Sequence, residues 1–417
     1  MKQHVVVLSH SPFIGGGELA LKSLIDSTNN RYRWTVIVPG NTPIDSAVTS
    51  ADVEYISLPS LPWWCYEAHS SPPKVNKSQL NKSLDSLREI AQNADLLMTN
   101  TITIPWLGLI AHELQKPHIW YVHEYGDIDH NLQFIAGYDE TLNIIAECSS
   151  RVLTISNDVK AHIGRVIPHK KIDIIHQSIN MSELTTLPVA SSFNKLSLLC
   201  MGAIKPSKGQ HIALEAVSAL PDVTLDIIGP AADHQFAYDL QQQAKDLPNV
   251  SVQIRRYKPL DELSSHNVVL MCSENEGLGR VTLEALAAGR LVIGYDCRST
   301  RELLDNNRGL IYSPNMASSL KKIIKAVTDN THLVNLDAGR SFVCREFSDE
   351  SQAKDFDHCV TNALKSEPID ANTLLLYLDI LEANNLWESP RQKVLIAVKR
   401  LIPKPAKHFA RRFMHRF

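Results

Sequence analysis

Short apolar runs alternate with helical patterns along almost the whole chain. In the first half, runs rich in β-branched residues predict strands at Val5–Leu8, Thr35–Val38, Val53–Leu58, Leu96–Thr99, Ile119–Val122, Val152–Ile155 and Asp173–Ile175. The second half predicts further strands at Ser197–Met201, Thr224–Ile228, Ser251–Ile254, Val268–Met271, Leu291–Tyr295 and Gly309–Tyr312. Apolar residues at helical spacing predict intervening helices, for example Glu18–Ile25, Gln79–Ala91 and Leu132–Ala146.

Apolar strands separated by helices predict an α/β fold with parallel sheets covered on both faces. About thirteen strands exceed the usual size of one sheet, so we expect two sheets, divided in the irregular stretch Ser182–Asn194. The uneven spacing of the units argues against a closed barrel. Two such domains form a cleft, and ligands of these folds bind at the carboxyl ends of the strands.

The composition is that of a globular protein. Of the 417 residues, 44% are hydrophobic and 21% are charged, and the net charge of −3 offers no basic field for nucleic acid. Seven scattered cysteines indicate core residues of a reducing compartment rather than disulfides or zinc ligands. The N-terminal run Val5–Leu8 is too short for a signal peptide, and no apolar stretch predicts a membrane span. We therefore expect a cytoplasmic protein, at most peripheral on the inner face of the membrane.

Two loops between a strand and a helix suggest anion binding. The loop after the first strand contains Gly15 and Gly16, which let a ligand approach the backbone at a helix start. A loop that merely needs positive φ is an equally good interpretation. The loop after Met201 carries Lys205 and Lys208 near another helix start, where they could hold a phosphate. Taken alone, two solvated surface lysines are the better interpretation of that loop.

A third loop is the most informative, because a pair of carboxylates flanks its helix. We expect this helix to start near Gly279, so that its first amides, those of residues 278–280, face a diphosphate. Glu276 precedes the helix and Glu284 lies on its second turn. Such a pair can accept hydrogen bonds from hydroxyls on both sides of a diphosphate, although a helical glutamate alone usually faces water.

The same loop permits a second interpretation. Gly277 and Gly279 open a helix after a strand, and Asp296 ends the next strand, which is the outline of a dinucleotide-binding fingerprint. The bulky Thr282 stands in the third glycine position, and the loop is far from the first βα unit. An oxidoreductase is therefore the weaker hypothesis.

Together these loops resemble those of the retaining GT-B glycosyltransferases of glycosyltransferase family 4, the group 1 transferases, over about residues 4–366. The matching segments are the E-x7-E pair Glu276 and Glu284, the Lys-Gly pair Lys208-Gly209, the glycine loop Gly15-Gly16, the strand end Trp120–Glu124, the crossing segment Ile174–Asn180 and the closing pair Arg301-Glu302. The resemblance implies two Rossmann-like domains facing across a cleft, with residues 1–182 on the acceptor side and residues 183–347 binding the nucleotide sugar. It also implies that a helix within residues 348–366 crosses back to the N-terminal domain.

The resemblance further implies a role for each residue. Glu284 would accept hydrogen bonds from the ribose and Glu276 from the sugar hydroxyls. Lys208 and the loop from Gly277 through Leu278, Gly279 and Arg280 would hold the diphosphate, and His123 would touch the donor sugar or the acceptor hydroxyl. The family often has Arg where this chain has Ala203, and either Lys205 or Arg280 could supply that charge.

In the implied reaction, the nucleoside diphosphate leaves while the acceptor attacks from the same face, and the leaving phosphate takes the acceptor's proton. We interpret Asp127 and Asp129 as loop acids and Asp349 as a helix-cap acid, so we expect no metal and no cofactor. The expected activity is sugar transfer from a nucleotide-diphosphate sugar to a glycan or lipid-linked acceptor of the envelope. A catalytically silent GT-B module and a sugar-nucleotide epimerase remain alternatives.

Residues 367–417 lie beyond the resemblance and predict a helical, basic, amphipathic tail. Residues 390–417 contain nine Lys or Arg and no acid, which leaves about −12 on the rest of the chain. An apolar stripe that includes Val394, Val398 and Leu401 is followed by phenylalanines at every fourth residue. Such helices bind the surface of anionic membranes, which predicts a membrane contact through residues 389–417. The alternative is a helix docked on the chain's own acidic body.

Overall fold

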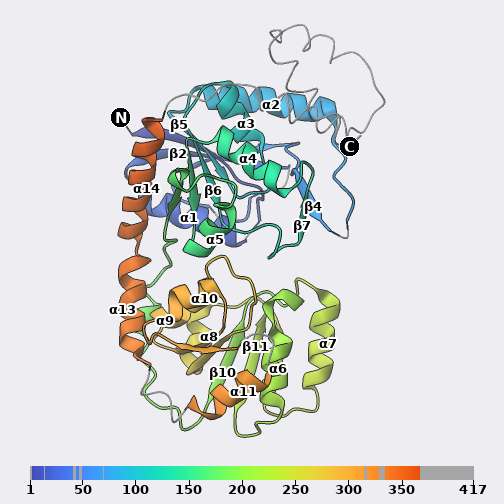
Figure 1. Ribbon diagram of the computed structural model, residues 1–417, viewed down its shortest axis with the longest axis vertical. Helices are drawn as coiled ribbons and strands as arrows, with labels where there is room; N and C mark the ends of the chain where they lie inside the picture. The colour runs from blue at the N-terminus through green and yellow to red at the C-terminus, as the bar shows by residue number, and fades with distance from the viewer. Residues whose placement is uncertain are drawn as a thin grey trace.

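The computed structural model describes residues 2–13, 15–40, 44–46, 49–68, 70–313, 317–327 and 334–366. Two α/β domains lie end to end, each built on a parallel sheet with helices on both faces (Figure 1). The two-sheet α/β fold predicted from the alternation of strands and helices is confirmed. The predicted tail, residues 367–417, lies outside the described residues.

The N-terminal sheet has seven parallel strands in the order β3-β2-β1-β5-β6-β8-β9. Its strands are β1 (Gln3–Leu8), β2 (Tyr32–Pro39), β3 (Glu54–Leu58), β5 (Leu96–Asn100), β6 (His118–Val122), β8 (Arg151–Thr154) and β9 (Ile172–Ile174). The C-terminal sheet has six parallel strands in the order β12-β11-β10-β13-β14-β15. These are β10 (Ser197–Met201), β11 (Thr224–Gly229), β12 (Val250–Ile254), β13 (Val268–Met271), β14 (Leu291–Tyr295) and β15 (Leu310–Tyr312). Each predicted strand coincides with one of them.

Helices follow most strands, because neighbouring parallel strands need a crossover connection. Those of the first domain are α1 (Gly16–Thr28), α2 (Lys77–Gln92), α3 (Trp106–Glu113), α4 (Tyr138–Cys148) and α5 (Asn157–Ile163). Those of the second are α6 (Gln210–Ser218), α7 (His234–Ala244), α8 (Pro259–Ser265), α9 (Arg280–Ala287), α10 (Arg298–Leu304) and α11 (Ala317–Lys325). Short 3₁₀ turns lie at η2 (His169–Lys171), η3 (Leu184–Thr186) and η4 (Pro206–Lys208). No described helix is long and apolar enough to cross a bilayer.

The predicted start of the helix Leu132–Ala146 is wrong. Residues 132–134 form β7 (Leu132–Phe134), which pairs antiparallel with β4 (Cys65–Glu67), and the helix itself begins only at Tyr138. Leu132 and Phe134 are buried while Gln133 between them is exposed, so this stretch has the period of a strand. The prediction was wrong because the apolar residues of β7 and α4 together have the spacing of one continuous helical face.

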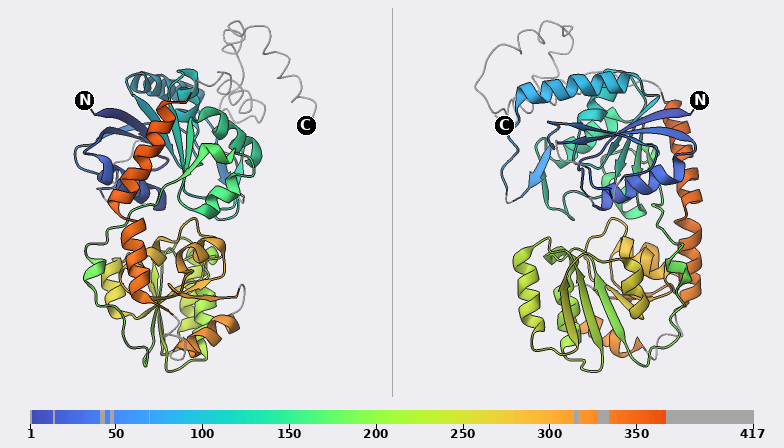
Figure 2. Two further views of the ribbon diagram at one scale, coloured as in Figure 1. Left: turned by 60° about the vertical axis from the view of Figure 1, so that its left-hand side comes forward. Right: turned by 180° about the vertical axis from the view of Figure 1, so that it is seen from behind.

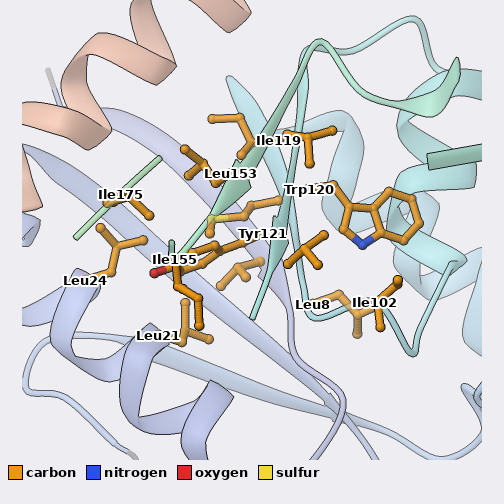
Figure 3. Close-up of a cluster of buried hydrophobic side chains, with 14 of the residues drawn as sticks. Leu8, Leu21, Leu24, Ile102, Ile119, Trp120, Tyr121, Leu153, Ile155 and Ile175 are labelled. Atoms are coloured by element: carbon orange, nitrogen blue, oxygen red, sulfur yellow. The ribbon is translucent and has the colours of Figure 1, made fainter. Parts of the chain in front are cut away.

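The core of the N-terminal domain explains why the strands of its sheet have almost continuously apolar sequences. Tyr121 of β6 points toward Leu21 and Leu24 of α1, whereas Trp120, the residue before it, points to the opposite face of the sheet (Figure 3). There its ring lies against Gly108 of α3. Every residue of β5 and β6 is buried. A strand covered on both faces needs apolar residues at successive positions, which gives the sequence its strongest signal.

Two consecutive helices connect the domains along one side of the molecule (Figure 1, Figure 2). Helix α13 (Leu336–Glu346) packs on α9 of the second domain, and α14 (Asp349–Leu364) packs on α1 of the first. Phe356 is fully buried, stacked on Trp34 at 5.5 Å between ring centroids and edge-on to Tyr32 at 5.4 Å. The predicted N-cap, Ser348, accepts a hydrogen bond from the amide of Ser351. The helix therefore returns to the first domain.

The carboxyl edges of the two sheets face each other. A Cβ placed on Gly277, in the loop after β13, would lie 2.6 Å from the carbonyl oxygen of His123, which follows β6. Any side chain at position 277 would therefore force the two loops apart. The chain passes from β9 to β10 through residues 175–196, and we propose the division at residues 182 and 183 within this segment.

Candidate functional site

The loop after β10 presents two lysines at the cleft. Lys205 precedes η4, Lys208 ends it, and both side chains are half-buried. Gly209 has φ +67°, and a Cβ there would lie 2.2 Å from the carbonyl oxygen of Cys272. Only glycine fits this position, because it combines a left-handed backbone with close contact to the loop after β13. Gly209 thus brings the lysine loop against the loop that carries Glu276.

Glu276 and Lys208 form an ion pair, with 2.5 Å between Oε1 and Nζ. Burial raises the pKa of the Glu276 carboxyl, but the charge and hydrogen bond of Lys208, the hydroxyl of Ser273 and the charge of Lys205 outweigh it. The net pKa is therefore lowered and Glu276 is ionised at neutral pH. The two residues to which the resemblance gave sugar and diphosphate contacts lie side by side.

Glu284 lies in the first helix beyond this loop, and it is buried rather than exposed. Helix α9 begins at Arg280 with Gly279 as its N-cap, as predicted from the sequence. The first amides of any α-helix lack an acceptor further back in the helix, so they are available to an anion. Glu284 Oε1 accepts a hydrogen bond of 3.0 Å from Nε of Arg280. Burial raises the pKa of Glu284, against the opposing charge of Arg280.

Lys205 and Arg280 face different parts of the site. Burial and the charge of Lys208 lower the pKa of Lys205, against the charges of Asp129 and Glu276. Arg280 instead pairs with Glu284. Lys205 therefore lies in the electrostatic environment of the Lys208–Glu276 pair, where a second cation would act on a diphosphate. Arg280 belongs to the other end of the site.

His123 lies across the cleft in a single defined tautomer. Asn100 donates its Nδ2 to the carbonyl oxygen of Gly17 at 3.2 Å, so its Oδ1 faces His123 Nε2 at 2.6 Å. Nε2 must then carry the proton, and the unprotonated Nδ1, which is buried without a partner among the described residues, is an acceptor. Burial, and then the charge of His10, lower the pKa of His123 to about 3. The imidazole is therefore neutral at neutral pH.

Three further titratable groups surround His123, and the sequence analysis gave none of them a role. His10 Nδ1 lies 3.0 Å from Oε1 of Glu18. Burial lowers the pKa of His10, but Glu18 and Glu124 outweigh it, so the net pKa is raised. Burial raises the pKa of Glu124 to about 7, and its carboxylate accepts hydrogen bonds from the amides of Ile102 and His123. The only sequence signal for these three residues was that they follow the carboxyl ends of β1 and β6.

The glycine loop of the first domain joins this group. Gly15 is the N-cap of α1 and Gly16 its first residue. The carboxylate of Glu18 curls back, so that a Cβ on Gly15 would lie 2.7 Å from Glu18 Oε2. A Cβ on Gly17 would lie 3.5 Å from the ring of His123 and 3.8 Å from that of His10. The loop therefore lies at the cleft beside His123, and a carboxylate of the chain already lies near its helix start.

Contacts between the domains hold the loop after β13 against the first domain. Tyr125 donates its hydroxyl to the carbonyl oxygen of Glu276 at 3.1 Å, and Ser156 donates to that of Gly277 at 2.5 Å. The amide and side chain of Asn157 donate to the carboxylate of Glu302. The structure thus brings His123 and Gly15–Gly16 to one side of the cleft and Lys205, Lys208 and Gly277–Glu284 to the other.

The remaining acids have structural partners. Asp296, the acid of the dinucleotide hypothesis, forms a two-pronged pair with Arg301. Asp129 accepts hydrogen bonds from the amides of Tyr125 and Gly126, and Asp127 pairs with His162. Asp127 and Asp129 are therefore loop acids, as the sequence analysis interpreted them.

Comparisons with known proteins agree with this geometry. Residues 189–338 match the family of glycosyl transferases group 1. The lipopolysaccharide core biosynthesis glycosyltransferase LpsE of Rhizobium meliloti (strain 1021) is 29% identical over 161 residues, which are 37% of this chain and 46% of LpsE. The chain thus spans about half the length of this curated relative.

Two solved structures are similar over almost the whole described chain. The HepE protein of Anabaena in complex with UDP has a TM-score of 0.70 at 18% identity and covers 87% of this chain and 100% of its own. The lipopolysaccharide outer core galactosyltransferase WaaB has a TM-score of 0.65 at 15% identity and covers 86% and 99%. At such identities the likeness shows the fold alone, and it confirms the GT-B arrangement of two Rossmann-like domains.

Proposed function

The chain belongs to the group 1 glycosyl transferases, whose family match covers its C-terminal domain, and on this premise we propose that it transfers a sugar from a nucleoside-diphosphate sugar to an acceptor hydroxyl with retention of configuration. The observation that carries the proposal is the pairing of Lys208 with Glu276 at the start of α9, opposite His123. A cation, a carboxylate and a helix N-terminus at one point form a site for an anion that carries hydroxyl groups.

The donor is held by the second domain. Lys208, Lys205 and the amides of Leu278, Gly279 and Arg280 bind the diphosphate, and the charge that develops on the leaving phosphate is stabilised there. Glu276 accepts hydrogen bonds from the sugar hydroxyls and Glu284 from the ribose. Binding of the diphosphate competes with Glu276 for Lys208, which leaves the carboxylate free to accept hydrogen bonds from the sugar.

His123 contributes as a neutral hydrogen-bond acceptor from the first domain. Its buried Nδ1 can take a hydrogen bond from a sugar or acceptor hydroxyl, while Asn100 fixes the ring through Nε2. With a pKa of about 3, the imidazole does not act as a cation toward the diphosphate. The leaving phosphate oxygen takes the acceptor's proton, so the mechanism needs no separate protein base.

We propose a glycan or lipid-linked glycan of the cell envelope as the acceptor and UDP as the first nucleotide to test. The support is that LpsE and WaaB bear names from lipopolysaccharide core synthesis and that HepE was solved with UDP. The basic residues 389–417, outside the described part of the chain, would bring the enzyme to an anionic membrane surface where such acceptors lie.

Thermal stabilisation by nucleotides tests donor binding, because a ligand that binds only the folded state raises the apparent stability. We expect UDP, UDP-glucose or another nucleoside-diphosphate sugar to raise the melting temperature of the full chain, and Lys208→Ala to reduce the shift. Turnover of a radiolabelled sugar nucleotide without any added acceptor would instead favour an epimerase. Binding without turnover in the presence of a lipopolysaccharide core oligosaccharide would favour a silent module.

A further inference from the structure

An exposed tryptophan lies beside the glycine loop of the first domain. Trp63, in the segment between β3 and β4, is 38% exposed. Its ring centroid lies 5.2 Å from that of His10, and its indole N–H donates to the carbonyl oxygen of His10 at 3.3 Å. His10 in turn lies close to Gly17 and His123. Trp63 is therefore separated from the His123 site by one aromatic ring.

The neighbours of Trp63 hold its backbone rigidly. The carbonyl oxygen of Pro62 accepts a hydrogen bond of 2.7 Å from the indole of Trp106. Trp64 is buried, stacked on Trp120 at 5.5 Å, and its indole donates to the carbonyl oxygen of Ile102 at 2.6 Å. The backbone of Trp63 is thus held on both sides, and its ring is held by the indole hydrogen bond to His10. The ring therefore loses little conformational freedom when a ligand contacts it.

Several exposed large apolar residues lie in loops that follow strands of the N-terminal sheet. Among the described residues six large apolar side chains are exposed, and half of them follow N-terminal strands at their carboxyl ends: Phe13 after β1, Trp63 after β3 and Ile128 after β6. The polar residues His10, Ser11 and Glu18 lie close to Phe13 along the chain, and His10 also contacts Trp63. An aromatic face beside polar groups matches a pyranose ring, which has an apolar C–H face and a rim of hydroxyls. A lipid chain would require a continuous apolar surface.

We propose that Trp63 is the stacking platform for a pyranose ring of the acceptor, which makes the acceptor a saccharide bound beside His10 and His123. The role of this saccharide as an acceptor rests on the proposed function, but saccharide binding at Trp63 can be measured separately. A ring stacked on Trp63 has its hydroxyl rim within reach of the paired His10 and Glu18. Trp63 would then determine acceptor affinity without contributing to donor binding.

The direct test follows the indole N–H signals of the ¹⁵N-labelled full chain by NMR. Trp63→Phe assigns the signal of Trp63, and the buried Trp64 and Trp120 serve as internal references. Methyl α-glucopyranoside and methyl β-galactopyranoside, added at high millimolar concentration, should shift the Trp63 signal and leave the references in place. If neither glycoside shifts it, or if only decyl phosphate does, the saccharide platform is wrong.

The kinetic test uses transfer to a deacylated lipopolysaccharide core oligosaccharide. Trp63→Ala should raise KM for this acceptor about tenfold or more, with kcat changed less than about threefold, and Trp63→Phe should restore most of the loss. Tyr238→Ala, which removes an exposed aromatic residue of α7, is the matched control and should leave both constants unchanged. An unchanged KM in Trp63→Ala overturns the inference.

Thermal stabilisation by UDP distinguishes failure of the Trp63 inference from failure of the proposed function. If UDP stabilises the wild type and Trp63→Ala equally, the donor site is intact and any change in KM belongs to the acceptor. If UDP and its sugars fail to stabilise the wild type, the proposed function fails, while the glycoside shifts still decide whether Trp63 binds a saccharide.

Discussion

Glu276 and Glu284 belong to one loop and helix, yet their surroundings move their pKa values in opposite directions. At Glu276 the charges of Lys208 and Lys205 outweigh burial and lower the pKa. At Glu284 burial outweighs the single charge of Arg280 and raises it. A diphosphate that binds Lys208 would displace the carboxylate of Glu276 from this lysine. Glu284 would keep its ion pair, because its partner Arg280 belongs to the same helix. This difference supports separate roles on the sugar and on the ribose.

Single alanine variants of these two residues should therefore separate binding from transfer. Glu284→Ala should weaken binding of bare UDP about tenfold, since a hydrogen bond to a charged group is lost. Glu276→Ala should spare UDP binding, because it frees Lys208, yet lower kcat about 10²-fold. Isothermal calorimetry and transfer assays measure the two effects, with the exposed Glu215→Ala as a control. Equal losses of UDP affinity in both variants would contradict the assignment.

Glu124 should make the stability of the protein depend on pH. Its pKa is about 7 in the folded chain, above the ordinary value of 4.5, so the folded state retains a proton that the unfolded state has lost. Stability from this group is complete below about pH 4.5 and is lost as the pH rises through 7, by up to about 3 kcal/mol.

Glu124→Gln cannot lose that proton, so its free energy of unfolding should fall less than that of the wild type between pH 5 and pH 8. Urea unfolding at both values measures the difference. A gap between variant and wild type that is the same at both pH values would show that Glu124 does not titrate in this range.

The sequence could single out the residues that we propose for donor binding, but not the group around His123. Glu276, Glu284 and Lys208 stand at characteristic spacings after strands, and the family resemblance carried their roles. His10 and Glu18 come from the β1–α1 loop and the first turn of α1, and Asn100 from the end of β5, and only the folded sheet brings them beside His123. The burial of Glu284 was also beyond prediction, because a glutamate inside a helix faces water unless another loop covers it.

At the scale of elements, strands of the parallel sheets were predictable because burial on both faces makes them continuously apolar. The antiparallel pair of β4 and β7 could not be predicted in this way. Each strand has three residues, and β7 lies directly before the apolar face of α4. Its only signal is the alternation of Leu132, Gln133 and Phe134, which is too short to distinguish from one turn of a helix.

Helix α14 should be essential to the stability of the first domain. Phe356→Ala removes a fully buried ring from the contact with Tyr32 and Trp34 and should cost about 3–5 kcal/mol. Leu364→Ala, at an exposed position of the same helix, should cost less than about 1 kcal/mol. Calorimetry of the full chain, with UDP added to mark the second domain, measures both. If Phe356→Ala destabilised only the UDP-dependent transition, α14 would belong to the second domain.

At the scale of the whole molecule, the charge of the chain is divided between a basic end and an acidic remainder. We predict that the full chain sediments with anionic liposomes at low salt, less at high salt, and not with neutral liposomes. Deletion of residues 389–417 should abolish this binding while leaving stabilisation by UDP unchanged. Equal binding by the truncated chain, or none by the full chain, would rule out the membrane contact and favour a helix docked on the acidic body.

The central claim is sugar transfer in the cleft between the two domains, with the donor on Lys208, Glu276 and Glu284. Its most direct measurement supplies a radiolabelled nucleoside-diphosphate sugar with and without a lipopolysaccharide core oligosaccharide and determines the anomeric configuration of the product by NMR. The account predicts label in the oligosaccharide only when it is present, linked with the configuration of the donor, and a loss of about 10²-fold or more in Lys208→Ala. An inverted product, or transfer that does not depend on Lys208, would contradict it.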